Sequence, residues 1–134
     1  MKLLSSLKNK VDFYLKNYKV ILDDKSEDEV SLRTAFKSRK YHREKYIKVK
    51  LTDDDRKWSC CIEKALKSIE YDKIAEAVEL AYIKRKDIEK ICDEVGIEQS
   101  TYYSWMNDVR FYILYFVFTS GLIDESEIRN VILF

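Results

Sequence analysis

Gly96 is one of only two glycines in this chain of 134 residues, which contains no proline. Apolar residues with helical spacing flank it on both sides, in residues 88–95 and 99–109. Glycine adopts the left-handed backbone conformation that ends a helix at little steric cost. The pattern therefore predicts two helices joined by a tight turn, which is the arrangement of a helix-turn-helix.

The scarcity of helix-breaking residues extends this prediction to the whole chain. Hydrophobic residues make up 46% of the sequence and charged residues 37%, as is typical of helical proteins. We expect an all-α fold, a helical bundle with a C-terminal helix-turn-helix, in a single domain spanning 1–134. Residues 1–50 would form an N-terminal helix and a basic arm, and residues 51–134 a helical core with the helix-turn-helix at about 87–110.

Apolar periodicity and capping residues place the individual helices. Residues 1–22 carry the apolar seam of a short coiled coil, which is expected to dock on the rest of the chain or on a second copy. The acidic residues 23–30 predict a linker or loop. In the basic arm, residues 46–50 alternate apolar and charged side chains, a pattern compatible with an extended segment.

The remaining helices are expected in the C-terminal part of the chain. Thr52 or Asp53 would cap the first of them, with carboxylates in its first turn. Another short helix would follow Asp124 at the end of the chain. The predicted ranges before it are 52–68, 72–83, 88–94 and 99–119.

Positive charge is concentrated in residues 31–50, although the net charge of the chain is only +1. This segment contains eight Lys or Arg and a single acid, Glu44, which gives it a charge of +7. Such a stretch attracts phosphates, or it forms a solvated charged face.

The second helix of the predicted helix-turn-helix offers polar side chains suited to DNA bases. Gln and Asn pair with adenine through two hydrogen bonds, Ser binds base edges or phosphates, and Tyr contacts a phosphate or a thymine methyl group. The expected base-contacting residues are Gln99, Ser100, Tyr103, Ser104 and Asn107. The expected phosphate-contacting residues are Lys84, Arg85, Lys86, Lys90 and Arg110. The alternative is an ordinary helical corner in which glycine serves only as the C-cap.

Ten positions between Cys61 and about Ile123 match the pattern of a known family. They are Tyr82, Ile83, Lys86, Ile88, Ile91, Cys92, Ile97, Ser100, Thr101 and Tyr102. The segment resembles the C-terminal half of the RinA/ArpU-type phage transcriptional activators, whose DNA-binding unit is similar to region 4 of sigma factors. The chain departs from that pattern at Ser104 and Trp105, where such regulators often carry Arg and a small aliphatic residue, and in the apolar residues 111–118. The resemblance implies a sequence-specific DNA-binding activator of phage or mobile-element type.

Two other binding functions are compatible with the same pattern. A terminase small-subunit-like DNA-packaging protein also joins a helix-turn-helix to oligomerising helices. A protein–protein adaptor would use the 111–118 helix and the N-terminal helix to bind a partner such as RNA polymerase. Either helix would also serve a homodimer that reads two half-sites of double-stranded DNA.

The sequence offers little for catalysis, metal binding or membrane insertion. His42 stands alone in the basic run, residues 53–55 point in different directions on a helix, and the three cysteines lack C-x-x-C spacing. We therefore expect no enzymatic activity, no metal and no cofactor. The apolar run 111–118 is shorter than the roughly 18–20 residues that cross a bilayer, and residues 1–15 do not resemble a signal peptide. A cytoplasmic location is expected.

Overall fold

The structure, a computed structural model, describes residues 5–25, 28–37 and 44–124. The helices are α1 (Ser5–Asp23), α2 (Asp53–Lys67), α3 (Asp72–Val78), α4 (Ile88–Val95) and α5 (Gln99–Thr119). A π-helical turn, η1 (Glu79–Ile83), continues α3, and the strands β1 (Val30–Lys37) and β2 (Glu44–Val49) form an antiparallel hairpin. The short helix expected after Asp124 lies outside the described residues.

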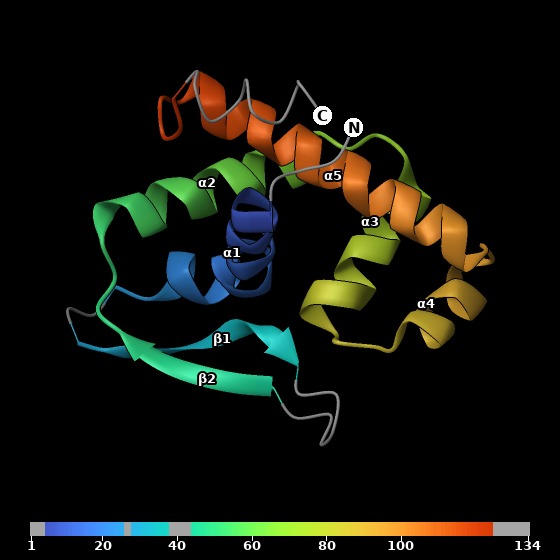
Figure 1. Ribbon diagram of the computed structural model, residues 1–134, viewed down its shortest axis with the longest axis horizontal. Helices are drawn as coiled ribbons and strands as arrows, with labels where there is room; N and C mark the ends of the chain where they lie inside the picture. The colour runs from blue at the N-terminus through green and yellow to red at the C-terminus, as the bar shows by residue number, and fades with distance from the viewer. Residues whose placement is uncertain (1–4, 26–27, 38–43, 125–134) are drawn as a thin grey trace.

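The elements are stacked around α1 (Figure 1). The hairpin packs on one side of α1, and α2 and α5 pack on other sides of it. In Figure 1, α5 crosses the top of the molecule and descends on the right, where its N-terminal end meets α4. The loop between η1 and α4 lies near the hairpin, because its Arg85 contacts Tyr46 of β2.

One continuous cluster of buried side chains connects these elements. In α1, the side chains of Val11, Leu15 and Ile21 are fully buried. They meet a core that includes Trp58 of α2 and Ile113 of α5. The prediction that the N-terminal helix docks on the chain itself is therefore confirmed.

The helix α2 begins at the cap that the sequence predicts. The Thr52 hydroxyl accepts a hydrogen bond from the backbone N of Asp55 at 3.2 Å, and the Asp55 carboxylate accepts one from the backbone N of Thr52 at 2.8 Å. This reciprocal pair is a capping box. The Tyr14 hydroxyl donates to the same carboxylate at 2.6 Å, which ties α1 to α2. Burial alone would raise the pKa of Asp55, but the hydrogen bonds from Tyr14 and Thr52 lower it below its usual value.

The hairpin corrects the expectation of an all-α fold, because the chain is mostly helical but not entirely so. In the hairpin, Val30 pairs with Val49 and Leu32 with Ile47, so their side chains share one face. On this face β1 packs against α1, where Leu32 is fully buried, whereas Ile47 of β2 stays 41% exposed. The extended segment anticipated within residues 46–50 is confirmed as part of β2. The prediction of a basic arm did not include the pairing of its two parts, β1 and β2, as a hairpin.

Two buried polar contacts attach β1 to the helices. The Asn17 side chain accepts a hydrogen bond from the backbone N of Arg33 and donates one to its carbonyl oxygen, both at 2.8 Å. Asn17 is fully buried and also donates to the carbonyl oxygen of Phe13 at 2.8 Å. The Arg33 guanidinium donates to the carbonyl oxygen of Tyr82 at 2.8 Å. The hairpin is therefore held by α1 on one side and by η1 on the other.

Candidate nucleic-acid interface

The helices α4 and α5 meet at the turn predicted around Gly96. Gly96 has a φ of 76°, in the left-handed region, and caps α4. Its backbone N and that of Ile97 both donate to the carbonyl oxygen of Cys92, at 2.8 and 3.0 Å. No atom lies within 4 Å of a Cβ built at Gly96, so the backbone conformation, not the available space, favours glycine here.

The inner faces of both helices contribute to the core. The buried side chains are Ile91, Cys92 and Val95 on α4, and Tyr102, Met106 and Val109 on α5. Trp105 of α5 is only partly buried and packs its ring edge against Tyr71, with 5.6 Å between ring centroids. The inner sides of α4 and α5 therefore belong to one core, with Trp105 at its border.

The opposite side of α5 carries the residues predicted to contact bases. We call this set the polar face of α5: Gln99, Ser100, Tyr103, Ser104 and Asn107. Its members recur at spacings of three and four residues, so they share one side of the helix. Four of them are exposed, with Tyr103 at 55%, and Asn107 is half-buried. The Tyr103 ring packs edge-on against Tyr102, at 5.5 Å between centroids, which limits its freedom.

The surroundings of the polar face are negatively charged. Exposed carboxylates on and beside α4 belong to Asp87, Glu89, Asp93, Glu94 and Glu98. Lys90 is the one base within residues 87–98, and it is exposed. Lys86, a predicted phosphate contact, forms an ion pair with Glu94. The helix pair therefore does not by itself attract phosphates.

Arg110, another predicted phosphate contact, is occupied inside the protein. Its Nε donates to Asp12 Oδ1 at 2.8 Å and its Nη2 to Asp12 Oδ2 at 3.4 Å. The Tyr82 hydroxyl donates to the same carboxylate at 3.3 Å. Burial, followed by the charge of Asp12, raises the pKa of Tyr82 above its usual value. Arg110 thus joins α5 to α1 and η1 and does not belong to the outer surface.

The last two predicted bases, Lys84 and Arg85, are exposed in the loop before α4. The Arg85 guanidinium donates to the Tyr46 hydroxyl of β2 at 2.7 Å and lies over the ring, 5.9 Å from its centroid. The structure therefore brings this loop against the hairpin. Sequence reasoning missed this contact, because the two residues are 39 positions apart and no local pattern links them.

Residues 43–113 match the model of a family described as "Protein of unknown function (DUF1492)". The match covers more than half of the chain. The chain belongs to this family. The DUF1492 segment runs from the start of β2 into the middle of α5, so it includes the Gly96 turn and the whole polar face. Comparison with curated proteins and with solved structures gives no significant match.

Two further findings concern the described residues as a whole. None of their helices combines the length and the apolar character that crossing a membrane requires. Within the same residues, no three His, Cys, Asp or Glu side chains come together as a metal ion would require.

Proposed function

We propose that this member of the DUF1492 family is a sequence-specific DNA-binding transcriptional regulator. It would act by binding and not by catalysis, with α5 in the major groove. The observation that carries the proposal is the polar face of α5, exposed at the start of a helix whose other side is buried. The resemblance to the RinA/ArpU-type activators supports an activator of phage or mobile-element type.

The dimensions of the polar face are compatible with groove binding. Gln99 and Asn107 are separated by eight residues, which corresponds to about 12 Å along a helix. At about 3.4 Å per base pair, that length spans three to four base pairs. Gln99 and Asn107 are proposed to bind adenine edges, and Ser100 and Ser104 to bind base edges or phosphates. Tyr103 would contact a phosphate or a thymine methyl group.

The test begins with a duplex selected from a random pool by the wild-type protein. Gln99→Ala and Asn107→Ala are each expected to weaken binding to that duplex by about 1–3 kcal/mol, because each removes a paired contact with a base. Binding to a duplex of mixed sequence should change little. Thr119→Ala, an exposed position at the other end of the same helix, is the control. Unchanged discrimination in both α5 variants would contradict the proposal.

A second candidate function rests on three aromatic residues of the C-terminal half of α5. Tyr112, Tyr115 and Phe118 are 37%, 62% and 38% exposed and follow one another at intervals of three residues. An aromatic stripe of this kind is enriched at protein interfaces. It favours an adaptor that binds RNA polymerase, a homodimer, or the ring of a terminase small-subunit-like protein. Mass measurement of the free protein separates these assemblies, and Tyr115→Ser should weaken whichever one forms.

A further inference from the structure

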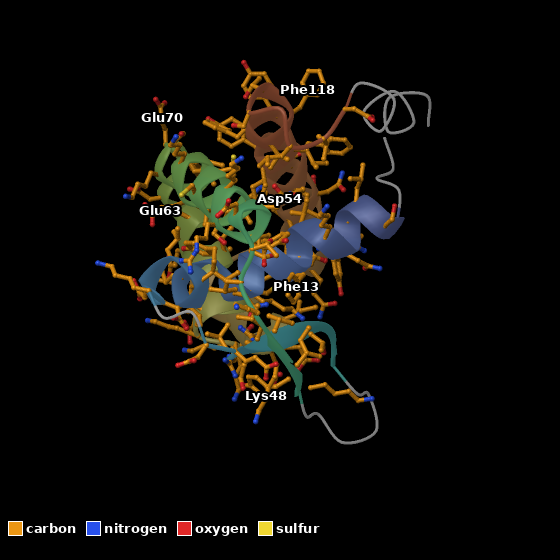
Figure 2. All side chains as sticks on the ribbon, turned by 90° about the vertical axis from the view of Figure 1, so that its left-hand side faces the viewer. Phe13, Lys48, Asp54, Glu63, Glu70 and Phe118 are labelled. Carbon is orange, nitrogen blue, oxygen red and sulfur yellow. The ribbon has the colours of Figure 1, made fainter. Side chains whose placement is uncertain are left out.

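The β hairpin carries the positive charge that α4 and α5 lack. Lys45 and Lys48 on β2, and Lys50 directly after it, are exposed. Residues 45–51 contain no acid. In Figure 2, Lys48 points away from the helices at the lower side of the molecule, whereas Glu63 and Glu70 lie well above it. The charge of the protein is therefore distributed unevenly, with a basic region around β2.

The loop before α4 extends this region toward the DNA-binding helices. Arg33 pairs with Tyr46 and Ser31 with Lys48, so Tyr46 and Lys48 share one face of the hairpin with Arg33, whose guanidinium binds η1. Arg85 binds the Tyr46 hydroxyl and covers its ring, and Lys84 is exposed beside it. We call the combined set the basic hairpin surface: Lys48, Lys50, Lys84 and Arg85. In Figure 1, β2, this loop and α4 follow one another along the lower side.

Arg85 has a backbone conformation that is unfavourable for a residue with a side chain. Arg85 has a φ of 57°, where a side chain meets steric resistance that glycine does not. The backbone N of Lys86 donates to the carbonyl oxygen of Leu80 at 2.9 Å, closing the end of the helix around Arg85. Glycine is the usual residue at such a site. An arginine here places a guanidinium over the Tyr46 ring of β2.

The basic hairpin surface is also held in a fixed position. Asn17 binds the backbone of Arg33 through two hydrogen bonds, and the Arg33 guanidinium reaches the carbonyl oxygen of Tyr82. Because η1 leads directly into the loop before α4, these contacts fix the hairpin relative to the start of α4. A partner that engages α5 would therefore meet the basic surface at a defined distance.

We propose that the basic hairpin surface binds the phosphate backbone of duplex DNA beside the groove that α5 enters. This inference rests on the proposed function and adds the source of its electrostatic attraction. The exposed carboxylates of α4 repel phosphates, so the long-range attraction comes from the hairpin and the adjoining loop. Lysine and arginine both bind phosphate oxygens through charge-assisted hydrogen bonds. Contacts of this kind carry no sequence information, but they set the register in which α5 reads the bases.

The test measures how salt weakens binding to a fluorescein-labelled duplex of mixed sequence. The double variant Lys48→Ala/Lys84→Ala is expected to reduce the slope of log affinity against log salt concentration by about 1.8, or about 0.9 for each phosphate contact removed. The ratio of affinities for selected and mixed-sequence duplexes should stay the same. Lys64→Ala/Lys67→Ala, which removes two exposed lysines of α2, is the matched control and should leave the slope unchanged.

Arg85→Gly distinguishes an effect of the Arg85 charge on binding from an effect on the stability of the fold. Glycine adopts the left-handed conformation of this position freely, so the melting temperature should not fall. The salt slope should nevertheless decrease by about 0.9, since the guanidinium is gone. Tyr46→Phe keeps the ring and removes the hydroxyl that orients Arg85, so a smaller decrease is expected.

The outcomes distinguish this inference from the proposed function. An unchanged slope in both Lys48→Ala/Lys84→Ala and Arg85→Gly overturns the role of the hairpin. The proposed function then stands if Gln99→Ala still lowers sequence discrimination. A reduced slope together with unaltered discrimination in Gln99→Ala and Asn107→Ala supports the hairpin and rejects α5 as the reading helix. Wild-type protein that binds no duplex at low salt overturns both.

Discussion

Removal of the Arg110 guanidinium tests whether this side chain belongs to the interior or to the proposed DNA-binding surface. Arg110→Ala deletes both hydrogen bonds to Asp12 and leaves its carboxylate with the Tyr82 hydroxyl. Losing one partner of a fully buried ion pair costs about 3–5 kcal/mol. The Arg110 and Asp12 side chains are 15% and 16% exposed, so water reaches the remaining carboxylate. We expect the free energy of unfolding to fall by about 2–3 kcal/mol, closer to the cost of losing one or two charged hydrogen bonds.

The assay is urea unfolding followed by tryptophan fluorescence, with thermal unfolding alongside. For a chain of this size, the loss corresponds to a decrease of about 8 °C in melting temperature. The double variant Asp12→Ala/Arg110→Ala leaves no unpaired charge, so its loss should be smaller than the sum of the two single losses by about 1–2 kcal/mol. Lys90→Ala removes an exposed base and should leave stability unchanged.

Two results would refute this reasoning. If the loss of unfolding free energy in the double variant equals the sum of the two single losses, Asp12 and Arg110 do not stabilise each other. An unfolding free energy that is unchanged in Arg110→Ala, together with weaker duplex binding, would place this guanidinium on the DNA.

Other predictions follow from single contacts. Gly96→Ala should lower the free energy of unfolding by about 1 kcal/mol, measured by urea unfolding, because its φ is 76°. Gly121→Ala, at a φ of 77°, should cost a similar amount without altering duplex discrimination. Asp55 has a lower pKa in the folded protein than in the unfolded chain, so the native state binds fewer protons there. Its contribution should be complete above about pH 4 and lost as the pH falls through the folded pKa, and Asp55→Asn should reduce the acid dependence of stability. Cys60 is exposed, so a thiol reagent should label it in the native state, whereas the two buried cysteines should react only after unfolding.

The helices of residues 52–119 could be predicted because several local signals agree there. Thr52 caps α2, Gly96 ends α4, and apolar residues recur between them with the period of a helix. The residues that form the hairpin do not carry several local signals that agree in this way. The alternation of Val30 and Leu32 is short, and charged residues dominate the segment that follows. The contact with α1 stabilises β1. The periodicity of residues 30–50 does not predict this contact.

In the candidate site too, some features could be predicted from local patterns and others could not. The exposure of the polar face follows from helical spacing alone, because the buried side chains of α5 determine which side is left outside. Whether a basic side chain is paired or exposed depends on residues that are distant in the sequence. Asp12 is 98 positions from Arg110, and Glu94, near the end of α4, is eight positions from Lys86. Charge counting treats all bases as equal, whereas the fold neutralises some and places others at the surface.

The contact between Asn17 and Arg33 also has a consequence for assembly. An isolated two-stranded ribbon is marginally stable in water, and an open strand margin invites pairing with another chain. At Arg33, the side-chain amide of Asn17 supplies the donor and acceptor that a third strand would otherwise provide. A helix thereby completes the ladder of β1 at this point. The ribbon gains a partner from its own chain, and strand addition by a neighbouring molecule is blocked there.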